Sequence, residues 1–137
     1  MVPREQPAPL RVLLVDDQPD LRLSLRFMLE HDEFLVSEAS NGAQALERLA
    51  REKIDVILTD LYMPDLDGIS LLRALGSLPA RPPIIAMSGW YKGHKDALDT
   101  ARELGANALL EKPFTRQDLV RTIRSLIGNG RPPTKER

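Results

Sequence analysis

Five runs of strand length, rich in aliphatic and β-branched residues, alternate with five helical patterns along most of the chain. The runs are residues 11–15, 34–36, 54–58, 84–87 and 108–110. Between and after them, apolar residues recur at intervals of three and four, the spacing of a helix that is buried on one side. These patterns lie in residues 21–29, 43–50, 69–75, 97–104 and 119–127. Strict alternation predicts an α/β fold, in which parallel strands are joined by right-handed crossovers and helices cover both faces of one sheet.

A chain of 137 residues suits one domain with a single hydrophobic core. Prolines and polar residues crowd both ends, so we expect a domain of residues 10–128 between loose segments 1–9 and 129–137. Nineteen basic and twenty acidic residues nearly cancel, which argues against direct binding to nucleic acid or to an anionic membrane. Cysteine is absent and no apolar run approaches the roughly 20 residues of a membrane span, so a cytoplasmic location is expected.

Chemically useful side chains follow four of the five predicted strands. Asp16 and Asp17 follow the first run, Asp60 the third, Ser88 the fourth and Lys112 the fifth. Ligands of such sheets bind at the carboxyl ends of the strands. If the first and third strands are neighbours, three carboxylates converge there, and they repel one another unless a cation or a proton lies among them. Mg²⁺ is the natural occupant, because it prefers carboxylates, water and phosphate oxygens.

The remaining members of this set suit a phosphoryl group. The Ser88 hydroxyl can donate a hydrogen bond to a phosphoryl oxygen, and the Lys112 ammonium can neutralise charge beside it. Carboxylates also serve as phosphoryl acceptors and form aspartyl phosphates. Asp60 is central in the set, so we expect it to be the nucleophile of a phosphoryl transfer that depends on positioning and charge neutralisation.

Taken together, the motifs resemble those of a known family, the receiver domains of two-component response regulators. The matching segments are Val15–Asp17, Asp60–Gly68, Ser88–Gly89, Gly105–Ala106 and Lys112–Phe114. Each segment alone is weak support, but their order and their positions at strand ends make chance agreement improbable. The resemblance extends over residues 10–127. It implies a flavodoxin-like (βα)5 three-layer sandwich with the parallel sheet order 2-1-3-4-5.

The resemblance also implies a role for each residue of the acidic set. Asp60 is the expected phosphoacceptor, in a Mg²⁺-dependent reaction. Asp17 and Asp60 are expected to bind Mg²⁺ directly and Asp16 through water, and the backbone carbonyl of Tyr62 completes the protein ligands.

Further implications concern the phosphoryl group and the end of the fifth strand. Ser88 and Lys112 are expected to hold the phosphoryl group, and the Lys112–Pro113 peptide bond is expected to be cis. Members of the family often carry a tyrosine or phenylalanine three residues before the lysine, whereas this chain has Leu109. A leucine has no ring to rotate inward, so the usual aromatic part of the phosphorylation switch has no counterpart here.

Each of these residues also has a simpler interpretation. Asp16 and Asp17 could cap the helix that begins near residue 19, and Asp60 could be a turn residue. Ser88 with the following glycine could form a plain turn, and Lys112 could be a solvated surface lysine. The combination of residues, and no single member, favours the phosphoryl site.

The predicted function is that of a receiver that accepts a phosphoryl group on Asp60 from a sensor histidine kinase or a phosphotransfer protein. It then signals by a conformational change to a partner protein, whose identity the sequence does not give. The only reactions it is expected to catalyse are its own phosphorylation and dephosphorylation. No output domain follows in the sequence, so the chain is expected either to act alone or to belong to a longer protein. The sequence does not decide whether two copies pair into a homodimer. Two alternatives are a receiver-like docking module that works without phosphorylation and a Mg²⁺-dependent phosphatase with an aspartyl nucleophile.

Overall fold

The computed structural model describes residues 8–61, 68–89, 99 and 101–127. Within them, five parallel strands form one sheet in the order β2-β1-β3-β4-β5, which confirms the expected topology. The strands are β1 (Arg11–Val15), β2 (Leu35–Ala39), β3 (Val56–Asp60), β4 (Ile84–Gly89) and β5 (Ala108–Lys112). The chain reverses its direction of travel across the sheet after β2, so β1 and β3, which are distant in sequence, become neighbours.

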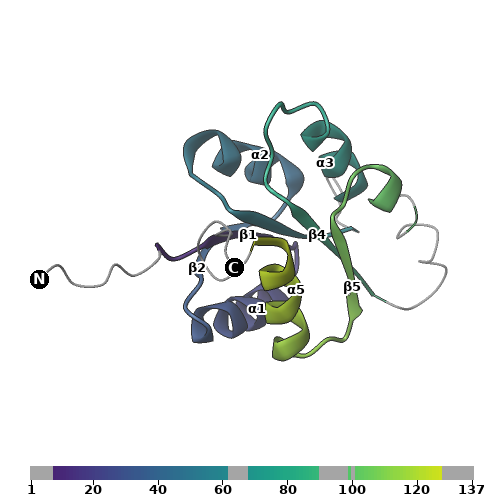
Figure 1. Cartoon of the computed structure of the whole chain (residues 1–137). Helices are drawn as coiled ribbons and strands as arrows, with labels where there is room; N and C mark the ends of the chain where they lie inside the picture. Colours follow the sequence, from purple (N-terminus) through teal and green to yellow (C-terminus); the bar gives the residue numbers. More distant parts are fainter. Residues whose placement is uncertain (1–7, 62–67, 90–98, 100, 128–137) are drawn as a thin grey trace, which may run out of the picture.

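The helices form a layer on each side of this sheet. They are α1 (Pro19–His31), α2 (Gly42–Arg51), α3 (Gly68–Leu75) and α5 (Arg116–Ile127). Figure 1 shows α2 and α3 on one face and α1 and α5 on the other. Of the helix predicted at residues 97–104, residues 99 and 101–103 are helical, whereas residues 97, 98 and 100 lie outside the described part of the chain. None of the helices described is long and apolar enough to cross a membrane.

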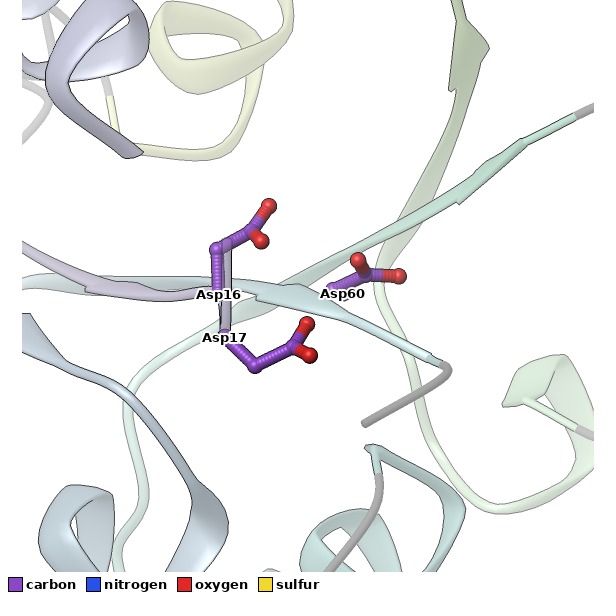
Figure 2. Close-up of side chains that lie close together, drawn as sticks. All are labelled: Asp16, Asp17 and Asp60. Carbon is purple, nitrogen blue, oxygen red and sulfur yellow. The ribbon is translucent and has the colours of Figure 1, made fainter. Parts of the chain in front are cut away.

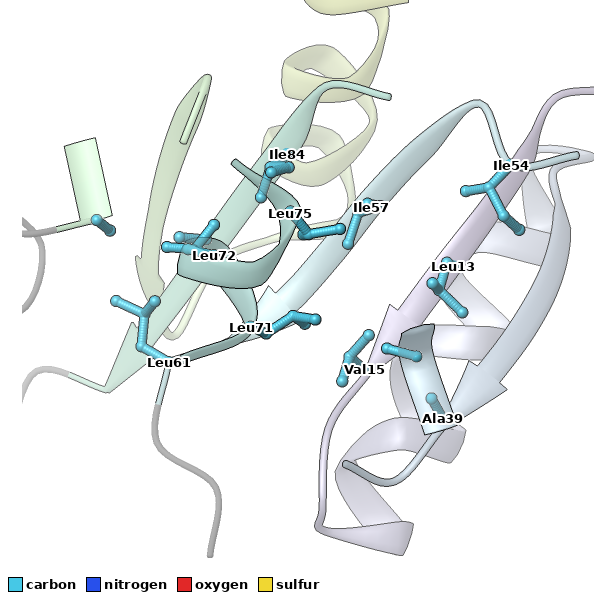
Figure 3. Close-up of a cluster of buried hydrophobic side chains, with 13 residues drawn as sticks. Leu13, Val15, Ala39, Ile54, Ile57, Leu61, Leu71, Leu72, Leu75 and Ile84 are labelled. Carbon is cyan, nitrogen blue, oxygen red and sulfur yellow. The ribbon is translucent and has the colours of Figure 1, made fainter. Parts of the chain in front are cut away.

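Two apolar clusters hold the layers together, one on each face of the sheet. Strand residues alternate between them, because successive side chains of a strand point to opposite faces. Leu13 and Ile57 point to the face covered by α2 and α3, and they belong to the same apolar cluster as Leu72 of α3 (Figure 3). Leu14 and Leu58 point to the other face, which α1 and α5 cover. All these side chains are fully buried, which explains why the strands read as continuous apolar runs.

Several strand boundaries differ from those predicted. β3 begins at Val56 and includes Asp60, whereas the prediction was residues 54–58, and β2 extends to Ala39 instead of ending at residue 36. β4 and β5 likewise end at Gly89 and Lys112, two residues later than expected. The predictions followed apolar side chains, but ladder hydrogen bonds join backbone groups and continue through polar residues. Asp60, Ser88 and Lys112, which were expected after their strands, therefore lie within the last two positions of β3, β4 and β5.

Helix starts follow local capping chemistry. The Asn41 side chain accepts a hydrogen bond from the Gln44 amide at 2.8 Å, at the start of α2. At the start of α5, Thr115 and Asp118 bind each other's backbone amides as a capping box. α1 instead has Gln18 as its N-cap with no side-chain hydrogen bond.

Candidate functional site

The three predicted acidic residues meet at the carboxyl ends of β1 and β3. Val15 pairs with Thr59 in the ladder, so Asp16 follows β1 beside Asp60, the last residue of β3. Figure 2 shows the Asp16 and Asp17 carboxylates extending toward the side on which Asp60 lies. One oxygen from each carboxylate lies within 4.8 Å of the others. The cluster forms because the sheet order makes β1 and β3 neighbours.

Asp16 is the most deeply buried of the three, with a fully inaccessible side chain. Its Oδ1 accepts a hydrogen bond from the Gln18 amide at 2.9 Å, but its buried Oδ2 has no hydrogen-bond donor within the described parts of the chain. Burial raises the pKa of the Asp16 carboxyl above its ordinary value. The Gln18 amide and the Lys112 ammonium lower this pKa, and the carboxylates of Asp60 and Asp17 raise it further.

Lys112 supplies the positive charge of the site from the end of β5. Its ammonium donates a hydrogen bond to Asp60 Oδ2 at 3.1 Å, and it forms an ion pair without a hydrogen bond with Asp16 Oδ2, 3.5 Å away. Its side chain is only 21% exposed, so the simpler interpretation as a solvated surface lysine is wrong. The Lys112–Pro113 peptide bond is cis, as the resemblance implied.

Ser88 lies on β4, between the strands that carry Asp60 and Lys112. Asp60 pairs with Met87, and Ser88 is the next residue along β4, where it pairs with Glu111. The Ser88 side chain is fully buried, and its hydroxyl donates a hydrogen bond to the Gly89 carbonyl at 3.1 Å. Tyr62, expected to contribute a backbone carbonyl, lies outside the described residues.

The arrangement suits a hard divalent cation. Among the described residues, three carboxylates face the ammonium of Lys112, so this part of the cluster carries an excess of negative charge, and a buried oxygen of Asp16 finds no donor there. An oxygen-rich set of this kind matches Mg²⁺, which binds through a few carboxylates and keeps waters for the remaining positions. Together with the ammonium of Lys112, a cation here can neutralise the oxygens of a phosphoryl group.

One contact of the site was not anticipated from the sequence. The guanidinium of Arg22, on α1, donates a hydrogen bond to the backbone carbonyl of Asp16 at 2.6 Å. The same side chain binds Glu38 of β2. The only sequence signal is that Arg22 and Arg26 are spaced four residues apart on a predicted helix, which is equally typical of a solvated face.

The sequence is similar to that of known signalling proteins. Residues 12–124 match the family model described as "response regulator receiver domain". The chain is 33% identical over 126 residues to the response regulator MprA of Mycobacterium leprae, covering 90% of this chain and 53% of that protein, and thus spans about half of that relative's length. It is 28% identical over 117 residues to the sporulation initiation phosphotransferase F of Bacillus subtilis, covering 85% of this chain and 93% of that one.

Solved structures agree with the sequence comparison. The receiver domain of the sensor histidine kinase PA1611 from Pseudomonas aeruginosa, which has a magnesium ion coordinated in its active site cleft, superposes with a TM-score of 0.79 at 32% identity, covering 89% of this chain and 100% of that one. A response regulator receiver domain protein from Clostridium thermocellum also gives 0.79, at 31% identity and with 85% and 93% covered. The chain therefore belongs to the receiver domains of two-component response regulators.

Proposed function

We propose that Asp60 is the phosphoacceptor of this receiver domain. The observation that carries the proposal is the hydrogen bond of 3.1 Å from the Lys112 ammonium to Asp60 Oδ2, at the end of a buried strand. An oxygen of Asp60 forms the new bond to phosphorus, while the phosphorus–nitrogen bond of a phosphohistidine donor breaks and its nitrogen leaves with the electron pair. The donor is a sensor histidine kinase or a histidine phosphotransfer protein.

We assign Mg²⁺ to the acidic cluster, with Asp17, Asp60 and the carbonyl of Tyr62 as direct ligands and Asp16 as a ligand through water. Two observations support this assignment: the close approach of the three carboxylates, and an Asp16 oxygen that has no hydrogen-bond donor among the residues described. The bound ion supplies charge neutralisation for the phosphoryl oxygens.

The other residues of the site act on the phosphoryl group. Lys112, whose ammonium donates to Asp60, donates to one phosphoryl oxygen once the group is attached. The Ser88 hydroxyl, which donates to the Gly89 carbonyl in this structure, rotates to donate to a second phosphoryl oxygen. The same reorientation at the end of β4 changes the adjoining surface, which a partner protein reads. The domain so defined comprises residues 10–128, with segments 1–9 and 129–137 outside it. Its location in the cytoplasm, its self-catalysed dephosphorylation and a homodimeric state stay predictions.

Phosphorylation by a small-molecule donor tests the proposal. The full chain is incubated with acetyl phosphate and Mg²⁺, and intact mass and site mapping are expected to show one phosphoryl group, on Asp60. The group should be absent from Asp60→Asn, and its formation should be much slower in Asp17→Ala. An unmodified wild-type chain, or the same modification in Asp60→Asn, would refute the assignment. Sustained turnover of a phosphomonoester would favour the phosphatase, and partner binding that ignores the donor would favour the docking module.

A further inference from the structure

Arg22 joins the acidic site to the edge strand of the sheet. Its Nη1 donates to the Asp16 carbonyl at 2.6 Å, and its Nε donates to Glu38 Oε1 at 2.8 Å. The side chain is 18% exposed, so water competes little for these bonds. A guanidinium presents its donors in a rigid plane, so fixing one edge on Glu38 also fixes the donor that reaches Asp16.

Glu38 is itself held by a second arginine. Arg26, one turn later on α1, donates to Glu38 Oε2 and, through its Nε, to Glu30 at 2.8 Å. The carboxylate of Glu38 therefore accepts from two guanidinium groups and is kept in one orientation. A partner with a fixed orientation makes Arg22 a defined anchor and not a mobile surface cation.

The backbone of Asp16 is constrained at both of its polar groups. Its amide donates to the Ala39 carbonyl of β2 at 3.1 Å, and its carbonyl accepts from Arg22. That carbonyl belongs to the planar peptide unit that connects Asp16 to Asp17. Any rotation of this unit moves the two carboxylates relative to each other, and the bond from Arg22 opposes that rotation.

We propose that Arg22 is a positioning residue for the acidic site: it holds the Asp16–Asp17 peptide so that both carboxylates face the cation and Asp60. The inference rests on the proposed function, because it assumes that the cluster binds Mg²⁺. Mg²⁺ demands near-ideal octahedral geometry at short distances, so it is sensitive to small displacements of its ligands. Glu38 acts one step further away, by orienting Arg22.

The charge of Arg22 and its positioning role predict opposite changes in the affinity for Mg²⁺ when Arg22 is replaced. A cation close to the site repels Mg²⁺, so by charge alone its removal should tighten Mg²⁺ binding. If Arg22 acts by position, its removal should weaken binding. Arg26 provides a matched control, since it pairs with the same Glu38 but the structure gives it no contact with Asp16 among the residues it describes.

The experiment compares Arg22→Gln, Arg22→Lys and Arg26→Gln with the wild-type full chain, using calorimetric titration with Mg²⁺. We expect Arg22→Gln to raise the Kd for Mg²⁺ by roughly tenfold, the lower end of the range for loss of a residue that orients metal ligands. Arg22→Lys keeps the charge but loses the two-donor fork, so its Kd should lie between those of Arg22→Gln and wild type. Arg26→Gln should stay within about twofold of wild type or bind more tightly. Unchanged or tighter binding by Arg22→Gln, or equal weakening by both glutamine variants, would overturn the proposal.

Amide hydrogen exchange without metal separates this inference from the proposed function. The Gln18 amide donates to Asp16 Oδ1 and the Asp16 amide to Ala39, so both report the conformation of this segment. Both amides should exchange faster in Arg22→Gln than in Arg26→Gln, measured where the two variants have equal global stability. If the wild-type chain binds no Mg²⁺, the proposed function fails, while this comparison still decides whether Arg22 holds the segment. Equal exchange in the two variants would refute that role.

Discussion

The Lys112 ammonium and the Asp60 carboxylate, 52 residues apart in the sequence, lie 3.1 Å from each other at the carboxyl edge of the sheet. Strand β4 separates the strands that carry them, so the contact forms only when β3, β4 and β5 are in register. The same ammonium lies 3.5 Å from Asp16. The Lys112 ammonium therefore contacts two of the three carboxylates in the cluster, and in the part of the chain that the structure describes no second cation joins it.

Replacing Lys112 should separate metal binding from phosphorylation. In Lys112→Met the apolar stem is retained and the charge is lost, so Mg²⁺ no longer competes with an ammonium for the same carboxylates. We expect the affinity for Mg²⁺ to rise on the order of tenfold, and phosphorylation of Asp60 by acetyl phosphate to slow by at least about 100-fold. Calorimetry and intact mass measure the two effects. Weaker Mg²⁺ binding in this variant would show that the ammonium helps to build the site instead of competing with the ion.

Asp16→Asn should stabilise the metal-free protein and remove its response to Mg²⁺. Asparagine keeps an oxygen for the Gln18 amide but removes a buried negative charge that lies close to two others. We expect the free energy of unfolding without metal to rise by about 1 kcal/mol. In the wild type, Mg²⁺ should raise Tm, because the ion binds the folded state, and chelation with EDTA should reverse the increase.

The control for this prediction is Asp20→Asn, which removes an exposed acid from the first turn of α1. It should leave the Mg²⁺-dependent rise in Tm unchanged. Thermal unfolding of both variants, with and without Mg²⁺, makes the comparison. A full Mg²⁺ response in Asp16→Asn would contradict the assignment of Asp16 to the metal site.

The ion pairs of Glu38 should make stability depend on pH in the acid range. Burial acts to raise the pKa of Glu38, but hydrogen bonds from Arg22 and Arg26 outweigh it and hold the pKa below the ordinary value of 4.5. For an acid whose folded pKa is lowered, the stabilising effect is fully present above the unfolded pKa. It is lost as the pH falls through the folded pKa.

The variant Glu38→Gln measures this effect. Its free energy of unfolding should be lower than that of wild type above pH 4.5, and the difference should shrink as the pH falls below that value. Glu47→Gln is the control, because the pair of Glu47 with Arg51 is mostly exposed, with side chains 61% and 71% accessible, and contributes little. Urea unfolding at several pH values tests both. A difference that stays constant through this range would exclude Glu38 as its source.

The strand-and-helix alternation of the sequence was sufficient to predict the layers. Strand-end polarity identified the residues that could meet, but the sheet order that brings them together came from the family resemblance. β1 was predicted without error because all of Val12–Val15 is buried, so its apolar run coincides with its ladder. β3 was predicted to end too early because the ladder continues through Thr59 and Asp60, both buried polar residues. Side-chain hydropathy carries no information about backbone pairing at such positions.

Arg22 shows why part of the site escaped prediction. Its acceptor is a backbone carbonyl, which every residue possesses, so no residue type in the sequence identifies the contact. Its second partner, Glu38, lies 16 residues away on the edge strand, and the pairing depends on how α1 lies against β2. Contacts of this kind follow from packing and not from a motif.

Two helix ends offer a matched test of backbone conformation. α1 ends in a Schellman motif, in which the Phe34 amide donates to the Leu29 carbonyl and Glu33 adopts a φ of 70°. Only glycine adopts such a φ without strain, so Glu33→Gly should raise the free energy of unfolding by about 1 kcal/mol. Urea unfolding gives the value, and a destabilised variant would contradict the explanation.

Gly105 occupies the equivalent position after residues 101–103, with a φ of 108°. A Cβ atom added there would lie 2.7 Å from the Arg81 guanidinium, which donates to the Gly105 carbonyl. Gly105→Ala should therefore lower the free energy of unfolding by about 1–3 kcal/mol, from backbone strain together with displacement of Arg81. The double variant Gly105→Ala with Arg81→Ala should recover less than the whole loss, since the strain persists. Full recovery would mean that the clash alone is responsible.

Leu109 should contribute to the core and not to the phosphorylation chemistry. On β5 it pairs with Ala86 of β4, and its half-buried side chain packs against the apolar cluster under α2 and α3. Leu109→Ala should therefore lower the free energy of unfolding by roughly 1–2 kcal/mol, below the range for fully buried leucines. Its rate of phosphorylation by acetyl phosphate should stay within about twofold of wild type, because the leucine carries no group that can bind a phosphoryl oxygen or a cation. Leu109→Phe should also destabilise the fold, because a larger ring is forced against a packed surface. If Leu109→Ala slowed phosphorylation strongly at unchanged stability, the leucine would have to influence the site at Asp60 directly.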